Sequence, residues 1–378
     1  MKKTLSILLA LVLILALCAC GDKTPQPAPA SPPPASGNTP SNQTDNSQPA
    51  APAPAPANPA QPAPASPDKV YTFSFSVADP KGSLEDQYFV IPFQNLLDEK
   101  TGGRVKLDVY YGSTLAGQGT TLDAIRNGVC DMGQDVCAMY PGQFLYNELL
   151  GTPGFDFGGY ENFSRVANEF SDVFYDKAMD SFVLIARFAF GDFGICTTKA
   201  PVYTPADMKG LMVRTSSQVI PWYEAMGASA TFLPMSDVYE SLRLSVINGV
   251  HTSVGSLYAF KLAEVSNYYT SLPMHCGDSV FVMSRDLYDT LPADLQAALD
   301  EVFAQMLDIG LNFAAETQQI TMDTSLDMNP NFQFIEPTDV DGFVQAALPL
   351  VMAKVAELNA AGLDGDGAYN WLMAHTVN

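Results

Sequence analysis

The sequence predicts an α/β fold with two lobes, preceded by a long segment that does not fold. Strand-like and helix-like segments alternate from residue 71 to residue 358, and residues 70–378 are numerous enough for two hydrophobic cores. Residues 71–78 alternate in polarity as a half-buried strand does. Residues 83–100 then predict a helix, which Pro92 should kink or split, and residues 105–110 predict the next strand.

The middle of the chain predicts a change of lobe. Residues 129–132 and 182–188 predict strands, and residues 161–180 predict a helix between them. Residues 190–194 are the expected crossing into the second lobe. Gly191 there is either a hinge residue or part of an ordinary loop.

A predicted strand at residues 280–283 is expected to return the chain to the first lobe. We therefore predict that lobe I comprises residues 70–191 and 278–318, and that lobe II comprises residues 192–277 and 319–378.

Two amphipathic helices are predicted near the carboxyl end, because apolar residues recur every three or four positions. The first begins at Pro292 and buries Leu295, Leu299, Val302, Met306, Ile309 and Phe313. The second covers residues 339–358 and buries Phe343, Ala347, Leu350, Val351, Val355 and Leu358.

The first 69 residues predict export and anchoring. A basic start and a short apolar run make residues 1–19 a lipoprotein signal peptide, with Cys20 as the lipidated residue. Cys18 is the weaker candidate, and an uncleaved anchor helix is the alternative. Residues 20–69 are a lipid-anchored linker rich in Pro and Ala, since residues 21–69 hold 15 of the 28 prolines. Either way the protein works outside the cytoplasmic membrane.

The chain is strongly acidic, with a formal net charge of −22. This charge argues against nucleic acid and anionic lipid as partners, and it disfavours long-range steering of an anionic solute. An anion site must therefore work through local, desolvated contacts. The cysteines form no C-x-x-C motif and only three His are present, so no metal site is predicted. Cys130 and Cys137 are either buried free thiols, which we favour, or a disulfide.

Arg214 is the first candidate site residue. Residues 211–214 alternate as a short strand after the turn at Gly210, which places Arg214 near the strand's carboxyl end, where α/β folds bind ligands. Its guanidinium matches a carboxylate. The alternative is a surface Arg on an edge strand.

An ordered series of motifs resembles the solute-binding proteins of tripartite ATP-independent periplasmic (TRAP) transporters. The series consists of Thr-Gly-Gly-Arg-Val at 101–105, Ala-Asp-Met-Lys-Gly at 206–210 with Arg214, Gly-Ala at 227–228, Pro234 with Asp237-Val-Tyr239, and Asn248-Gly249. The resemblance implies a periplasmic-binding-protein-like fold with a hinge and a long bracing C-terminal helix. It also implies that Arg214 clamps the carboxylate of an organic acid.

The chain departs from the family pattern around this clamp. Met235 stands in or near the place of a frequent aromatic residue, Thr252 replaces an Asn, and the second Arg expected near residues 194–196 is missing. Asp192, His251 and Tyr258 are further candidate pocket residues. Trp222 and Tyr223 are either pocket wall or core, and we favour the core for each. We expect a ligand with one carboxylate and fewer polar groups than a sugar acid.

No catalytic motif is present, so the sequence does not predict an enzyme. The predicted function is a lipid-anchored, extracytoplasmic receptor that passes a small organic acid to a TRAP permease, with no cofactor. The alternatives are a ligand sensor for a membrane signalling receptor and a surface hydrolase or adhesin.

Overall fold

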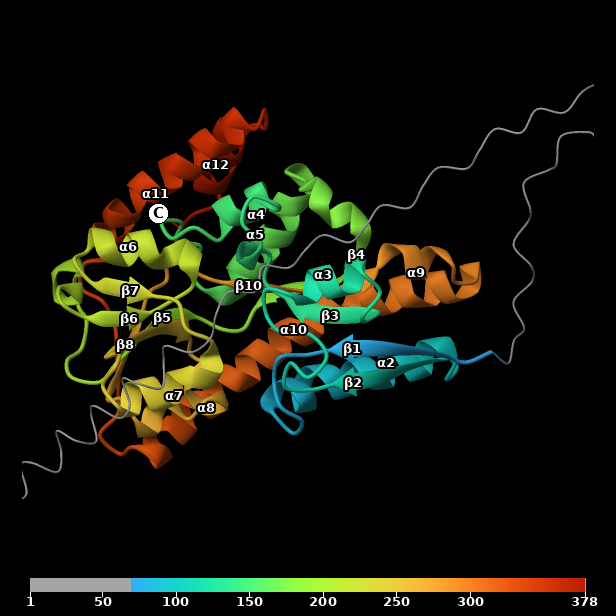
Figure 1. Ribbon diagram of the computed structural model, residues 1–378, viewed down its shortest axis with the longest axis horizontal. Helices are drawn as coiled ribbons and strands as arrows, with labels where there is room; N and C mark the ends of the chain where they lie inside the picture. The colour runs from blue at the N-terminus through green and yellow to red at the C-terminus, as the bar shows by residue number, and fades with distance from the viewer. Residues whose placement is uncertain (1–68, 378) are drawn as a thin grey trace, which may run out of the picture. The chain divides into compact units, whose positions relative to one another are not determined.

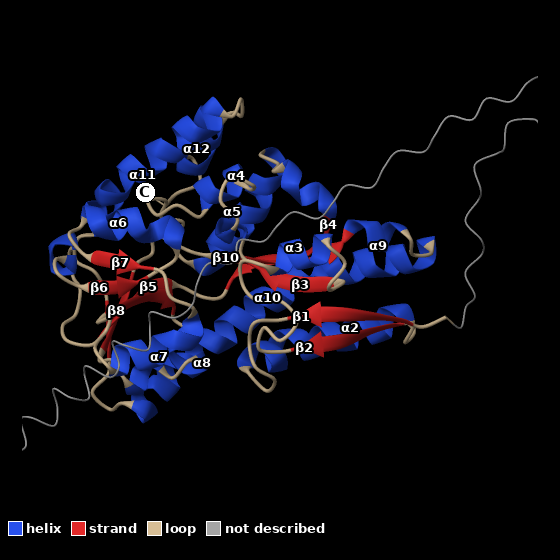
Figure 2. Ribbon diagram, viewed as in Figure 1, coloured by secondary structure: helices blue, strands red, loops and turns tan. Residues whose placement is uncertain are grey.

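The computed structural model describes residues 69–377, which are built on two β-sheets with helices packed around them (Figures 1 and 2). The predicted signal peptide, Cys20 and residues 20–68 of the linker lie outside the described residues.

The first sheet has five strands in the order β2-β1-β3-β10-β4. The strands are β1 (Tyr71–Ser76), β2 (Val105–Tyr110), β3 (Met132–Asp135), β4 (Phe182–Ala189) and β10 (Asp278–Ser284). Strands β1, β2 and β3 are parallel, while β10 runs antiparallel between β3 and β4. The strand predicted at 280–283 does lie in this sheet.

The second sheet has six strands in the order β11-β9-β5-β8-β6-β7. The strands are β5 (Phe193–Thr197), β6 (Met212–Arg214), β7 (Ser229–Thr231), β8 (Gly249–Ser253), β9 (Tyr268–Ser271) and β11 (Gln333–Ile335). Strand β6 is parallel to both β7 and β8, so the carboxyl ends of these three strands meet at one edge.

The chain passes from the first sheet to the second between β4 and β5. Gly191 lies at this crossing with a φ of +98°, a conformation that disfavours any side chain. Asp192 at this crossing is held by two other segments of the chain. Its carboxylate accepts a hydrogen bond from the Tyr160 backbone N–H at 2.9 Å and from Gln318 Nε2 at 3.3 Å.

Helices cover the two sheets. They are α2 (Ile91–Thr101), α3 (Thr121–Arg126), α4 (Leu145–Leu150), α5 (Tyr160–Val173), α6 (Ile220–Ala225), α7 (Met235–Arg243), α8 (Ser256–Ala259), α9 (Arg285–Asp289), α10 (Ala293–Met328), α11 (Val340–Ala360) and α12 (Gly365–Met373). A π-helical turn, η1 (Asp86–Val90), leads into α2, and Pro92 lies in the first turn of α2. The helical backbone is continuous here, since the Ile91 N–H bonds to the Asp86 carbonyl five residues back, and Pro92, which has no N–H, follows this widened turn.

Helix α10 connects the two sheets, as the predicted bracing helix should (Figure 1). Its predicted stripe is buried except for Ile309, which is half-buried, and it packs on the aromatic core of the five-stranded sheet. At its other end Met328 packs against the cluster beneath the six-stranded sheet. Gly310 allows close approach, since a Cβ there would lie 2.3 Å from the Phe188 ring.

Helix α11 buries the predicted face, with Leu350 only half-buried. By length and composition it is the one helix within residues 69–377 that could cross a membrane. Phe343 and Ala347 pack beneath the six-stranded sheet, and Val351, Val355 and Leu358 pack with α4, α5 and α12. This packing is that of a core helix.

Two local expectations were wrong, and one helix was missed. Strand β3 begins at Met132 rather than at residue 129, because the Asp131 carboxylate instead accepts hydrogen bonds from Ser74. Helix α5 ends at Val173 rather than at residue 180, and the Asp176 carboxylate accepts the backbone N–H groups of Tyr146 and Asn147. Helix α12 was not predicted.

The four cysteines within the described residues are buried free thiols, so Cys130 and Cys137 form no disulfide with each other. Burial raises the pKa of the Cys130 thiol to about 11, which keeps it protonated and unreactive at neutral pH. The favoured reading of the sequence is therefore confirmed.

Candidate functional site

A cavity of about 1090 Å³ is lined by residues from both sheets and from α10. The five-stranded sheet contributes the segments that follow β1 and β3 and the start of β10. The six-stranded sheet contributes the segments that follow β6 and β8. The ends of parallel strands expose backbone and loop side chains that sheet pairing does not use, which is why α/β folds place ligands there.

Arg214 is the last residue of β6 and lines this cavity. Only 7% of its surface is exposed. Its Nε donates to the Leu233 carbonyl at 2.8 Å, and one terminal nitrogen lies 3.5 Å from the His251 carbonyl. Its guanidinium carbon lies 6.0 Å from the centre of the Phe232 ring. The backbone and the ring thus hold the guanidinium in one orientation.

Arg214 forms no ion pair with any acidic side chain among residues 69–377. Burial lowers its pKa to about 10, so the group still carries its charge at neutral pH. A buried, unpaired cation is costly unless an anion compensates it. The cavity beside Arg214 can admit such an anion.

Two histidines lie next to Arg214 in the cavity wall. His251 and His275 are buried with their ring centres 4.7 Å apart, and Phe193 packs against both. Burial lowers the pKa of His275 to about 4, and burial together with His275 and Arg214 lowers the pKa of His251 well below its usual value. Both rings are therefore neutral at pH 7.

The other candidate residues fall into two groups. Met235, Thr252, His251 and Tyr258 line the cavity together with Arg214. Asp192 does not belong to the lining residues, because its carboxylate is bound to Tyr160 and Gln318 at the crossing between the sheets.

Trp222 and Tyr223 are fully buried in the core of the six-stranded sheet, as expected. Trp222 donates from Nε1 to the Phe343 carbonyl at 3.1 Å, whereas the Tyr223 hydroxyl has no hydrogen-bond partner within residues 69–377. Neither residue lines the cavity.

Several cavity residues were not singled out from the sequence. They are the acidic pair Asp79 and Glu85 in the segment after β1, His275 before β10, and the aromatic rings of Phe193 and Phe232. In the sequence Asp79 and Glu85 look like ordinary turn and helix-start residues. No pattern brings His275 close to His251, because only the pairing of β5 with β8 and β9 does so.

Two other charged groups of the wall are already paired. Lys354 of α11 contacts Glu148 at 2.5 Å and Glu357 at 2.8 Å. Asp278 forms an ion pair with Arg187, which is buried behind the wall. These pairs hold the wall in place and leave Arg214 as its unpaired buried cation within the described residues.

Comparison with known proteins places the chain in a family. The family model of the bacterial extracellular solute-binding proteins, family 7 (DctP), matches residues 75–357. The 2,3-diketo-L-gulonate-binding periplasmic protein YiaO of Escherichia coli K12 is 25% identical over 238 residues, 61% of this chain and 71% of that protein. The C4-dicarboxylate-binding periplasmic protein DctP of Rhodobacter capsulatus is 27% identical over 232 residues, 60% of this chain and 69% of that protein.

A solved structure shows the same fold. The TRAP solute-binding protein of Rhodoferax ferrireducens T118, in complex with copurified benzoate, superimposes with a TM-score of 0.74 at 20% identity, over 81% of this chain and 97% of that one. The expected two-lobed binding-protein fold is therefore confirmed. The family match covers most of the chain, and this protein belongs to the bacterial extracellular solute-binding protein family 7, the DctP-like solute-binding proteins of TRAP transporters.

Proposed function

We propose that this protein captures a small organic acid outside the cell membrane, with Arg214 holding its carboxylate, and delivers it to a TRAP permease. The main support for this proposal is the buried guanidinium of Arg214, which lines the cavity and has no acidic partner among the described residues. Carboxylates and guanidinium groups form paired, charge-assisted hydrogen bonds that suit this position. The relatives are consistent with this class of ligand, since one is named for C4-dicarboxylates and one structure holds benzoate.

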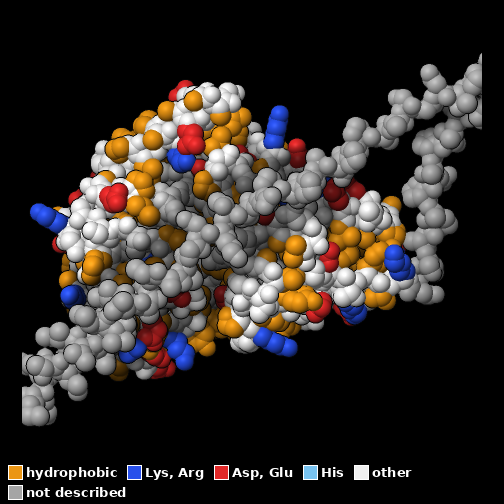
Figure 3. Space-filling model, in the orientation of Figure 1, with side chains coloured by type: hydrophobic (Ala, Val, Ile, Leu, Met, Phe, Trp, Pro, Cys, Tyr) orange, Lys and Arg blue, Asp and Glu red, His pale blue; other side chains and the backbone are white. Residues whose placement is uncertain are grey.

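The surface charge agrees with capture by local contacts. On the face shown in Figure 3, the Lys and Arg side chains are scattered rather than gathered, and the chain as a whole is acidic. Long-range attraction of an anion is therefore weak. We propose that residues 70–191 with 278–318 close on residues 192–277 with 319–378, which excludes water and strengthens the contact to Arg214.

A ligand screen tests this function. The purified protein is heated with monocarboxylates, dicarboxylates, sugar acids and neutral sugars, and its unfolding temperature is recorded. A ligand at 100 times its dissociation constant stabilises the folded state by about 2.7 kcal/mol, which is a shift of at least a few degrees. We expect shifts with carboxylates that are absent in Arg214→Ala. Shifts only with neutral solutes, unchanged in that variant, would contradict the proposal.

We also propose that a lipid on Cys20 anchors the protein to the outer face of the membrane, with residues 20–69 as a spacer. The support is the signal-like start and the cysteine that follows Ala19. We expect Cys20→Ala to move most of the protein from the membrane fraction to the soluble extracytoplasmic fraction. Cys18→Ala is the matched control and should leave it on the membrane. Membrane retention of Cys20→Ala would contradict the assignment.

A further inference from the structure

Glu85 is a buried acidic residue of the cavity wall whose carboxyl group has no partner among residues 69–377. It lies directly before η1, in the segment that follows β1, and it lines the cavity. Only 1% of its surface is exposed, and neither carboxyl oxygen has a hydrogen-bond partner in the described part of the chain. Buried polar groups are nearly always paired, so such a group calls for a specific explanation.

The neighbouring acidic residues do not supply a partner. Asp86 is engaged elsewhere, because its carboxylate accepts from the Gly82 backbone N–H at 2.8 Å and from the Tyr111 hydroxyl at 2.7 Å. Asp79 also lines the cavity, and burial raises its pKa to about 6. Burial first, and then the charges of Asp79 and Asp86, raise the pKa of Glu85 well above its usual value. Asp79 and Glu85 therefore hold a proton more tightly than isolated carboxyl groups do, and within the described residues neither Asp79 nor Asp86 donates a hydrogen bond to Glu85.

No basic side chain compensates this corner either. Among residues 69–377, neither Asp79 nor Glu85 takes part in an ion pair. Lys81 is the nearest basic residue in sequence, and its side chain is exposed. Lys354 is already bound to Glu148 and Glu357. A cation that enters with a ligand would stabilise the ionised form of Glu85, which no basic side chain of the described wall does.

A second buried acceptor, on His275, has no hydrogen-bond partner in the part of the chain that the structure describes, and His275 lines the same cavity. His275 Nε2 lies 3.1 Å from the Gly151 carbonyl, which can only accept, so this nitrogen carries the ring proton. The other ring nitrogen, Nδ1, is then a bare acceptor, and it is buried without a partner in the described residues. The cavity thus offers acceptors from Glu85 and His275, in addition to the cation of Arg214.

We propose that the ligand is a zwitterion, in which a carboxylate binds Arg214 of the six-stranded sheet and a protonated amine binds Glu85 beside the five-stranded sheet. This inference rests on the proposed function, because it keeps Arg214 as the carboxylate clamp. An ammonium group brings both the positive charge and the N–H donors that the acidic corner lacks. A ligand that contacts residues beside both sheets makes all of its contacts only when the two lobes are close together. Its binding therefore favours closure of the lobes.

Paired probes that differ only in the amine test this inference. Binding to the full protein is measured by calorimetry for γ-aminobutyrate against butyrate and for phenylalanine against 3-phenylpropionate. We expect the amine-bearing member of at least one pair to bind tenfold or more tightly than its partner. Glu85→Gln should abolish that preference, because the amide keeps the shape and removes the charge. Glu99→Gln, an exposed change of equal charge on α2, should leave it intact.

The outcomes separate this inference from the proposed function. If the probes without an amine bind as tightly as their amine-bearing counterparts, and still depend on Arg214, the ligand is not a zwitterion. The role of Arg214 in binding the carboxylate then stands. An amine preference that Glu85→Gln does not change overturns the role of Glu85. Binding of neither class, or binding indifferent to Arg214→Ala, overturns both. Circular dichroism of Glu85→Gln and a parallel Asp79→Asn variant show whether a lost preference reflects misfolding.

Discussion

Arg214→Ala is expected to weaken carboxylate binding by roughly 30-fold to several thousand-fold, or about 2–5 kcal/mol. The effect is large because the side chain is buried, is oriented by the Leu233 and His251 carbonyls, and has no acidic partner in residues 69–377 that could take the place of a ligand. Removing it leaves the carboxylate of the ligand in a closed cavity without a counter-charge. Titration calorimetry with the best carboxylate from the screen measures the change.

Two further variants test whether the loss of affinity is specific to the guanidinium of Arg214. Arg243→Ala removes an exposed Arg of α7 whose one ion pair within residues 69–377 is with Glu240, and it should leave affinity unchanged. Arg214→Lys keeps the charge but loses the planar pair of donors, so we expect an intermediate loss. A change of less than a few-fold in Arg214→Ala would contradict the clamp.

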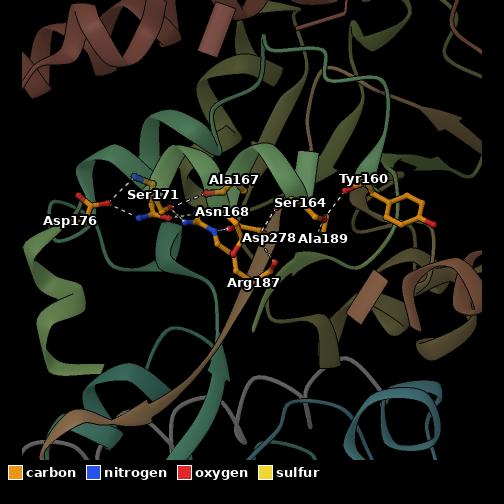
Figure 4. A network of polar contacts seen from close by, with 10 residues as sticks. Tyr160, Ser164, Ala167, Asn168, Ser171, Asp176, Arg187, Ala189 and Asp278 are labelled. Carbon is orange, nitrogen blue, oxygen red and sulfur yellow. Dashed lines mark hydrogen bonds and ion pairs between the residues drawn. The ribbon is translucent and has the colours of Figure 1, made fainter. Parts of the chain in front are cut away.

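Arg187→Met is expected to destabilise the protein by about 3–5 kcal/mol, the largest effect on stability that we predict. Arg187 of β4 is almost fully buried, and it forms an ion pair with Asp278 and donates to Ser171 (Figure 4). It also donates to Asn147. Asn147 in turn donates to Asp176. Removing the Arg leaves the Asp278 carboxylate buried without its counter-ion. The unfolding temperature should fall by about 5 °C or more.

A double-mutant cycle separates the ion pair from simple loss of packing. Arg187→Met combined with Asp278→Asn should cost less than the sum of the two single changes, by about 1–3 kcal/mol, since the pair is already broken in either one. Arg165→Met, which removes an exposed Arg of α5 paired with Glu161, is the matched control and should have little effect. Additive costs in the cycle would show that the pair contributes nothing of its own.

The local pattern of the chain was enough to predict most of the secondary structure. The alternation at residues 105–110 and the apolar stripe from Leu295 to Phe313 correspond to β2 and α10, because a strand or a helix with one buried face needs that period whatever its neighbours are. The prediction was wrong where side chains from distant segments intervene. Asp131 and Asp176 bind backbone groups of other elements, and β3 and α5 have different bounds as a result.

The sequence by itself determined that Arg214 ends a strand, because the apolar alternation before it is a local feature. It also determined that the chain is an extracytoplasmic binding protein, because the motifs around Arg214 can be read along the chain. Only the tertiary structure decided what surrounds it. Asp192 binds Tyr160 and Gln318 instead of lining the cavity. Glu85 and His275 do line it, and the Glu85 carboxyl oxygens and His275 Nδ1 have no hydrogen-bond partner among the described residues. The physical reason is that burial and hydrogen-bond pairing depend on segments far apart in the chain, which come together only when the two sheets and α10 enclose one cavity.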